Sequence, residues 1–178
     1  IFLFFATTAL KKDPGVSFPA PEPREVNTVG VLGAGFMGAG IASVAAQQGT
    51  SVRLKDTDVA RVGKGIAAVS EVLRERLKKK QITRLQYDDQ LALVGGTAEY
   101  TGFGRADLVI EAVFEDLALK HRVLREVEPS LEADAIYASN TSTIPITRIA
   151  TAAARPNRVL GMHFFSPVHK MPLLEVIV

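Results

Sequence analysis

The sequence predicts an α/β fold in which helices cover both faces of a doubly wound, mostly parallel sheet. Short apolar runs alternate with longer segments of helical periodicity from residue 28 to residue 178. The best-defined unit is 28–55, where an apolar run, a glycine-rich turn, an alanine-rich helical segment and a second apolar run follow one another. With 178 residues, the chain is long enough for one such domain and the edge of another.

The glycine-rich turn has the spacing G-x-G-x-x-G, formed by Gly33, Gly35 and Gly38. The first glycine permits the tight turn out of the strand, the second lets a pyrophosphate approach the backbone, and the third lets helix and strand pack closely. The helix expected over 36–48 would present N–H groups and the positive end of its dipole to that pyrophosphate. We therefore expect a dinucleotide to be bound by Gly33, Gly35, Phe36, Met37 and Gly38.

Asp56 stands at the end of the second apolar run, 51–55, and 18 positions after Gly38. An acid at this place accepts hydrogen bonds from the hydroxyls of an adenosine ribose. Its charge would repel a 2′-phosphate, so the pattern favours NAD over NADP, although the nearby cations Lys55 and Arg61 leave the preference open. Together these features indicate a Rossmann-type fold. FAD and S-adenosylmethionine enzymes share parts of the pattern, and this stretch alone does not exclude them.

Composition narrows the classes of function. Hydrophobic residues make up 47% and charged residues 22%, the balance of an ordinary globular protein. The net charge of +2 gives no argument for a nucleic-acid partner. The chain has no Cys, which excludes disulfides, thiolate catalysis and Cys-ligated zinc, and we expect no metal site.

Residues 1–25 are expected to precede the domain. Ile1–Leu10 is apolar but too short to span a bilayer, and Lys11-Lys12 follow it, which argues against a secretory signal. Asp13–Glu25 is rich in proline and typical of a linker. Because the chain begins without Met, we interpret Ile1–Leu10 as the end of a helix from a preceding domain, with the present domain starting near Val26.

Two helices are expected after Asp56, a long one over 59–80 and a shorter one over 83–93. The long helix has one apolar stripe, formed by Ile66, Val69, Leu73 and Leu77. We interpret its charged face, 71–80, as solvated. The alternative is an electrostatic site for an acidic group such as the phosphates of coenzyme A.

The remaining segments continue the alternation. Strands are expected at 96–100, 106–110, 135–138, from 158 through 161, and at 173–178, and helices at 117–127 and 145–150.

Two polar stretches follow strands in this arrangement, Glu115-Asp116 and the cluster 139–143. Each can be a helix start or a turn. Alternatively both face a ligand, because ligands of open α/β sheets lie outside the carboxyl ends of the strands. Hydroxyls of the cluster and the amide of Asn140 would then face the cofactor.

His163 and Glu175 are the candidate acid–base pair. Oxidation of an alcohol requires a base for the hydroxyl proton, and imidazole suits this role because its unperturbed pKa is about 6.5. Glu175 stands in an otherwise apolar run, where a buried acid without a partner would be costly. Pairing with a strand that carries His163 would supply a partner and fix the tautomer of the imidazole. The alternative is a structural histidine and an edge-strand glutamate. His121 and His169 are expected at the surface.

Four separated motifs in one order carry a resemblance to a known family. They are VGVLGAGFMGAGIA, DLVIEAVFEDLALKHRVLREVE, ASNTSTIPITRIA and GMHFFSPVHKMPLLEVI. Together, over residues 26–178, they resemble the NAD-binding domain of L-3-hydroxyacyl-CoA dehydrogenases. The resemblance implies NAD as the cofactor, and it removes the flavoenzyme and methyltransferase alternatives.

The resemblance also implies roles for individual residues. Gly33, Gly35 and Gly38 would hold the NAD pyrophosphate and Asp56 the adenosine ribose, and the residues along the nicotinamide side would be Ala112, Glu115 and Lys120. Ser142 would contact the substrate hydroxyl or the nicotinamide, His163 would be the general acid and base, and Glu175 would orient it. Ser166 stands where the family often has Asn, so it is a weaker candidate for a contact with the substrate carbonyl.

The implied reaction is the reversible oxidation of an L-3-hydroxyacyl-CoA to a 3-ketoacyl-CoA in fatty-acid β-oxidation. The likeness extends to the multifunctional, trifunctional-type α-subunits, in which an enoyl-CoA hydratase domain precedes the dehydrogenase, and 3–15 resembles the end of that linker region. In this family a helical domain follows the sheet, so we expect it to lie beyond Val178.

The same resemblance implies an oligomer that can include a thiolase subunit, located in the mitochondrial matrix of a eukaryote or the cytoplasm of a bacterium. One alternative is a biosynthetic 3-hydroxybutyryl-CoA dehydrogenase that runs as an NAD(P)H-dependent reductase. The other is a cofactor-binding module without turnover.

Overall fold

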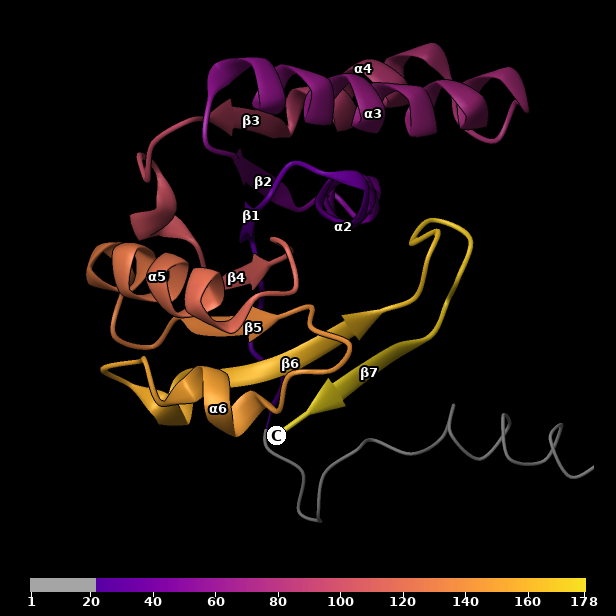
Figure 1. The fold of residues 1–178 in the computed structure, drawn as a ribbon. Coiled ribbons are helices and arrows are strands. Elements are labelled where there is room, and N and C mark those ends of the chain that lie inside the picture. The colour runs from indigo at the N-terminus through magenta and orange to yellow at the C-terminus, as the bar shows by residue number, and fades with distance from the viewer. Residues whose placement is uncertain (1–21) are drawn as a thin grey trace, which may run out of the picture.

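The computed structural model describes residues 22–178, and these form a seven-stranded sheet with helices on both faces (Figure 1). The strands are β1 (Thr28–Leu32), β2 (Ser51–Lys55), β3 (Val94–Thr97), β4 (Leu108–Glu111), β5 (Ile136–Ser139), β6 (Val159–Phe164) and β7 (Leu174–Ile177). The α-helices are α2 (Phe36–Gln47), α3 (Val59–Lys78), α4 (Arg84–Ala92), α5 (Leu117–Val127) and α6 (Ile146–Ala150). Short 3₁₀ turns lie at Phe103–Arg105, Glu128–Ser130 and Pro156–Arg158.

The strand order is β3-β2-β1-β4-β5-β6-β7. All neighbouring strands are parallel except β6 and β7, which are antiparallel. The chain moves outward from β1 through β2 to β3, then crosses back to β4 beside β1, so the order reverses between β1 and β4. This confirms the doubly wound, mostly parallel sheet, and the reversal marks the place where such folds bind ligands.

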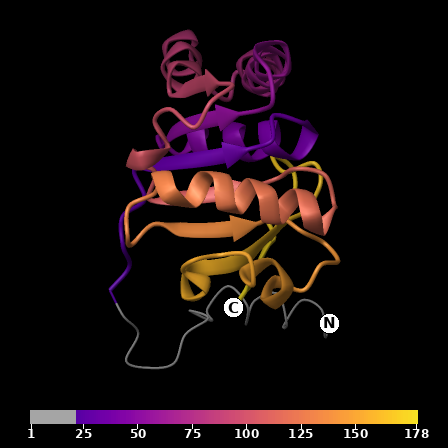
Figure 2. The same cartoon turned by 60° about the vertical axis from the view of Figure 1, so that its left-hand side comes forward.

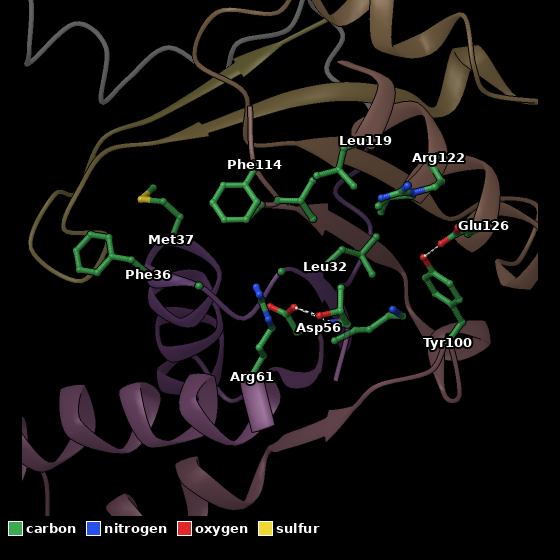
Figure 3. Close-up of a pocket in the computed structure, with 17 residues that line it drawn as sticks. Leu32, Phe36, Met37, Asp56, Arg61, Tyr100, Phe114, Leu119, Arg122 and Glu126 are labelled. Atoms are coloured by element: carbon green, nitrogen blue, oxygen red, sulfur yellow. Dashed lines mark hydrogen bonds between the residues drawn. The ribbon is translucent and has the colours of Figure 1, made fainter. Parts of the chain in front are cut away.

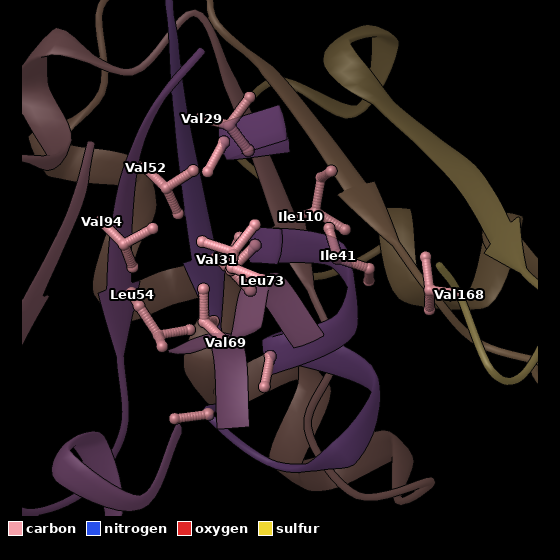
Figure 4. Packing of buried hydrophobic residues seen from close by; sticks show 14 of the residues in the cluster. Val29, Val31, Ile41, Val52, Leu54, Val69, Leu73, Val94, Ile110 and Val168 are labelled. Atoms are coloured by element: carbon pink, nitrogen blue, oxygen red, sulfur yellow. The ribbon is translucent and has the colours of Figure 1, made fainter. Parts of the chain in front are cut away.

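Helices cover the two faces of the sheet (Figures 1 and 2), and an apolar cluster on each face holds them there. On one face α2 and α3 pack over β1 and β2, where Val31, Leu54 and Val69 are fully buried beside one another (Figure 4). On the other face α5 and α6 cover Val109 of β4, together with the buried ring of Phe103. Burial on both faces explains why the central strands have few polar residues.

Strand β3 begins at Val94, two residues earlier than the sequence predicts, and ends at Thr97. Val94 and Gly95 join the sheet because they lie opposite Val52 and Arg53 of β2. A Cβ at Gly96 would stand 2.4 Å from Val62, so this glycine lets α3 approach the strand. After Thr97 the chain turns away, because the Thr97 hydroxyl accepts the N–H of Glu99. The glycines that weaken the strand pattern are thus part of the packing.

The charged face of α3 is exposed, and several of its charges pair with one another. Arg74 lies 3.1 Å from Glu71, and Lys79 lies 3.9 Å from Glu75. These exposed pairs fit the solvated face that we expected.

The two histidines expected at the surface, His121 and His169, are both partly exposed. Nε2 of His121 lies 2.7 Å from the carbonyl oxygen of Arg148 and joins α5 to α6. The predictions for Ile1–Leu10 and for most of Asp13–Glu25 lie outside the described residues. Within 22–178, no helix is both long and apolar enough to cross a bilayer.

Candidate active site

The glycine turn between β1 and α2 has the geometry that its spacing predicts. Gly33 has a φ of +100°, which favours glycine. A Cβ on Gly38 would stand 1.8 Å from the carbonyl oxygen of Gly33, so only glycine fits where the helix passes the strand. A Cβ on Gly35 would meet nothing within 4 Å, which leaves the backbone open to a ligand. The three glycines therefore serve a turn, an open approach and a close packing contact.

The start of α2 faces this opening. Within the described residues no side chain caps the helix, whose N-cap is Gly35. Asp56, at the carboxyl end of β2, accepts the N–H of Ala34 at 2.8 Å and the N–H of Thr57 at 2.7 Å. These bonds hold the carboxylate at the edge of the turn, where the ribose of a dinucleotide on the turn would lie.

A cavity of about 400 Å³ extends outward from the turn (Figure 3). Asp56 and Arg61 lie beside its centre, and Tyr100 and Glu126 lie at one end, joined by a hydrogen bond of 2.7 Å. Its lining includes Leu32, Gly33, Gly35, Phe36, Met37, Lys55, Ala112, Val113, Phe114, Leu119 and Arg122. A second cavity, of about 330 Å³, is lined by Met37, Ala112, Val113, Glu115, Asn140, Ser142, His163, Phe164, Phe165 and Ser166. Because Met37, Ala112 and Val113 line both, the two cavities adjoin.

The predicted acid–base pair is brought together at the second cavity, which His163 lines and Glu175 does not. His163 of β6 lies directly opposite Glu175 of β7, and Nδ1 of the imidazole lies 2.8 Å from Oε2 of the carboxylate. On the other side of the ring, Nε2 lies 3.3 Å from Oγ of Ser142. The pairing of the two strands that we predicted is therefore confirmed.

The sequence analysis treated Glu175 as a buried acid that needs a partner, and this was wrong. Its side chain is 53% exposed, and all of β7 is exposed because the strand forms the edge of the sheet. The His163 side chain is 20% exposed, so the imidazole is the more enclosed partner. Solvent reaches the carboxylate, and the register of the hairpin, rather than desolvation, fixes the pair.

Other predicted residues surround this pair. Asn140 accepts the N–H of Phe164 through its side-chain oxygen at 2.9 Å, which ties the end of β5 to the end of β6 beside His163. The ring of Phe165 lies 4.7 Å from the imidazole, measured between centroids. Ser166 is exposed and lines the cavity. Asn140 thus has a structural contact in addition to its place in the cavity wall.

Glu115 holds the loop that follows β5. One of its oxygens accepts the hydroxyl of Thr141, the N–H of Ser142 at 3.1 Å, and both the N–H and the hydroxyl of Thr143. Burial alone would raise the pKa of this carboxyl. The hydrogen bonds from Thr141 and Thr143 and the charge of Lys120 outweigh it and lower the pKa to about 2. Glu115 is therefore a carboxylate that shapes the cavity wall.

Lys120 lies behind the cavity and lines neither of the two spaces. Its side chain is 1% exposed and lies 3.2 Å from Glu115 and 2.8 Å from Glu111. In this structure Lys120 borders the cavity only through its contact with Glu115, and its place beside the nicotinamide stays a prediction. Glu111 is the residue that the sequence analysis missed. An acid ending an apolar strand, with a lysine on the following helix, was the available signal.

The family is decided by comparison with known proteins. A model of the NAD-binding domain of 3-hydroxyacyl-CoA dehydrogenase matches residues 28–178. The chain belongs to this family. NAD is accordingly its cofactor, and the open backbone at Gly35 and the uncapped start of α2 fit the pyrophosphate of that cofactor.

Solved structures of the 3-hydroxyacyl-CoA dehydrogenase family are similar to the chain. FadB2 of M. tuberculosis is 38% identical over 86% of this chain and 54% of its own, with a TM-score of 0.83. The (S)-3-hydroxybutyryl-CoA dehydrogenase PaaH1 of Ralstonia eutropha is 39% identical over 85% of this chain and 54% of its own, with a TM-score of 0.83.

A more distant structure shares the fold. The dehydrogenase part of multifunctional enzyme 1 from C. elegans is 23% identical over 90% of this chain and 38% of its own, with a TM-score of 0.77. The chain thus spans about half the length of the first two of these proteins, or less in the third.

Proposed function

We propose that this NAD-binding domain belongs to an enzyme that oxidises L-3-hydroxyacyl-CoA to 3-ketoacyl-CoA, reversibly. The observation that carries the proposal is that His163 and Ser142 line a cavity that adjoins the one at the glycine turn, while Glu175 holds the imidazole from behind. Hydride transfer needs an alcohol carbon near the cofactor and a base for the hydroxyl proton, and this arrangement offers both places within one crevice.

His163 would act as the base through Nε2. Because Nδ1 donates its hydrogen to the Glu175 carboxylate in the neutral imidazole, Nε2 carries the lone pair on the side of the cavity. When Nε2 takes the C3 hydroxyl proton, the charge that appears on the ring is stabilised by Glu175, as in other acid–base pairs. NAD, when bound, supplies the acceptor for the hydride from C3. In the reverse direction His163 returns the proton to the carbonyl oxygen.

Ser142 would position the reacting oxygen. Its hydroxyl can donate to Nε2 in the absence of substrate, and it lies in the same cavity wall, so it can bond the substrate hydroxyl beside the base. Ser166 lies in the segment that follows β6 and lines the same cavity. It is the proposed hydrogen-bond donor to the substrate carbonyl, in the place where the family often has Asn.

The cofactor contacts that we propose follow the crevice. Gly33, Gly35, Phe36 and Met37 would hold the pyrophosphate and Asp56 the ribose, and the nicotinamide side would be formed by Ala112, Glu115 and Asn140. Gly38, which lines neither cavity, would contribute by letting α2 pass close to the turn. Lys120 would contribute by holding Glu115.

We propose further that the domain works within a multifunctional β-oxidation enzyme, preceded by a hydratase domain and followed by a helical domain. The proposal rests on the resemblance of the motifs in 26–178 to the multifunctional α-subunits, and the C. elegans dehydrogenase part shows that the same fold occurs in a multifunctional enzyme. On this proposal the protein is an oligomer that can include a thiolase subunit, and it acts in the mitochondrial matrix or, in a bacterium, in the cytoplasm. The second candidate is a 3-hydroxybutyryl-CoA dehydrogenase that runs as a reductase, and the similarity to the dehydrogenase PaaH1 supports its substrate.

Acetoacetyl-CoA reduction by the complete protein, followed with NADH and with NADPH, tests the proposal. We expect turnover with NADH and at least roughly tenfold lower kcat/KM with NADPH, because Asp56 repels a 2′-phosphate. A preference for NADPH would favour the reductase. If calorimetry detects NAD binding but neither coenzyme supports turnover, the protein is a cofactor-binding module.

A further inference from the structure

A buried ion cluster lies behind the second cavity. Glu111, the last residue of β4, has a side chain that is 0% exposed, and that of Lys120 on α5 is 1% exposed. Nζ of Lys120 lies 2.8 Å from one Glu111 oxygen and 3.1 Å from the other. Removing two charges from water is expensive, so a pair of this kind persists only where its remaining hydrogen bonds are also made.

The Glu111 carboxylate has all of its hydrogen-bonding positions filled. One oxygen accepts Lys120 and the N–H of Val113 at 2.8 Å, and the other accepts Lys120 and the hydroxyl of Ser139 at 2.7 Å. A carboxylate offers about four lone-pair sites, and here four donor contacts occupy them. A fully satisfied network in a buried place holds its members in one geometry.

The network continues from this cluster to the catalytic histidine. The ammonium of Lys120 also pairs with Glu115 at 3.2 Å, and Glu115 holds Ser142 through its backbone N–H. Ser139, another partner of Glu111, is the last residue of β5 and leads into the same loop. The Ser142 hydroxyl then meets His163. An unbroken series of contacts therefore runs from a residue with no access to solvent to the base of the proposed reaction.

Stability alone does not explain the ion pair. Apolar side chains of similar volume often stabilise a core as well as a buried ion pair does, or better. Such a replacement would leave the second oxygen of Glu115 without Lys120. The ion pair therefore does something that apolar side chains would not do. It fixes the Lys120 ammonium so that it faces Glu115.

We propose that Glu111 is a positioning residue, whose ion pair with Lys120 holds Glu115 and, through Glu115, holds loop 141–143 so that Ser142 meets His163. This inference rests on the proposed function for its effect on the rate. Glu111 itself lines neither cavity and contacts neither His163 nor the space for substrate.

A double-mutant cycle in the complete protein tests the proposal. In the wild-type background, Glu111→Gln should lower kcat for acetoacetyl-CoA reduction by roughly 10–100-fold, the cost of a misplaced catalytic group. In a Ser142→Ala background, the same change should lower kcat by no more than about twofold, because the side chain that it positions is already gone. An equal loss in both backgrounds would overturn the proposal.

Loss of folding is separated from loss of positioning by a second variant. Glu111→Gln removes the negative charge that is paired with the buried Lys120 ammonium, so Tm should fall. Glu111→Gln with Lys120→Met removes both charges and should recover Tm while kcat stays low. Recovery of both would mean that the cluster is structural only. As a matched control, Glu128→Gln alters another buried carboxylate, which binds the N–H groups of Ala154 and Arg155, and should lower Tm with kcat within about twofold of wild type.

A crystal structure tests the position of Ser142 without an activity assay. In a crystal structure of the Glu111→Gln, Lys120→Met variant, Ser142 Oγ should lie beyond hydrogen-bond distance, about 3.5 Å, from His163 Nε2. An unmoved Ser142 would overturn the inference. A wild-type protein without turnover would refute the proposed function instead, and the crystal structure would still decide the positioning role.

Discussion

Two glycines of one motif differ in what a side chain would meet. At Gly38 a methyl group would collide with backbone, 1.8 Å from the Gly33 oxygen, whereas at Gly35 it would enter open space. The first glycine therefore serves the fold and the second serves the ligand. Position in the motif predicts this difference, since the second glycine is expected beside the pyrophosphate and the third at the contact of helix and strand.

A pair of alanine substitutions separates the two roles. Gly38→Ala should destabilise the domain by about 3 kcal/mol, the upper end of the usual cost of overpacking, because backbone must move. Gly35→Ala should change stability by no more than about 0.5 kcal/mol and weaken NAD binding by roughly tenfold, about 1.4 kcal/mol, since its methyl group occupies the approach of the pyrophosphate. Denaturant unfolding and calorimetry with NAD measure the two effects. Equal effects of both substitutions on stability would contradict the assignment.

Between elements, the decisive contacts join the carboxyl ends of neighbouring strands. Glu115, after β4, holds the loop after β5, and Asn140, after β5, holds the end of β6. In each case a side chain at the end of one strand accepts hydrogen bonds from backbone N–H groups at the end of the neighbouring strand. Together they give the second cavity a wall that does not depend on the apolar core.

Glu115 makes this wall sensitive to acid. Its pKa is about 2 in the folded protein against an ordinary 4.5, so the folded state binds fewer protons than the unfolded state between these values. The stabilisation is complete above about pH 4.5 and is lost as the pH falls towards 2. Because the side chain is 38% exposed, solvent screening reduces the effect.

The prediction compares Glu115→Gln with wild type by thermal unfolding. Near neutral pH the variant should have a Tm lower by about 2–4 °C, the shift that about 1 kcal/mol produces in a domain of this size. The difference should shrink as the pH falls below about 4.5. A difference that stays constant from neutral pH to about pH 3 would show that the carboxylate charge is not what stabilises the loop.

The sequence predicts some of these element contacts and misses others. The connection between β6 and β7, residues 165–173, is shorter than a parallel crossover needs, so an antiparallel pair could be expected, and the register confirms it. Nothing in the periodicity shows that β7 is an edge strand, so the burial argument for Glu175 failed. The Glu111–Lys120 pair needs the packing of α5 on β4, a relation between elements that neither segment shows alone.

At the scale of the whole molecule, the sheet order brings distant segments to one crevice. The glycine turn after β1 and the 112–115 run after β4 are far apart in the chain, yet β1 and β4 are neighbours. The alternation of strands and helices predicts the fold class and most element boundaries to within a few residues. The two cavities adjoin because the strand order reverses between β1 and β4. The order of the strands along the chain does not reveal this reversal.

The central claim is that His163 is the acid–base group of a 3-hydroxyacyl-CoA dehydrogenase, and one measurement tests it most directly. In the complete protein, His163→Gln should lower kcat for acetoacetyl-CoA reduction by roughly 10²–10⁴, the usual share of general acid–base catalysis, and leave the Kd for NAD nearly unchanged. A variant that keeps wild-type kcat, or one that loses NAD binding along with activity, would contradict the account.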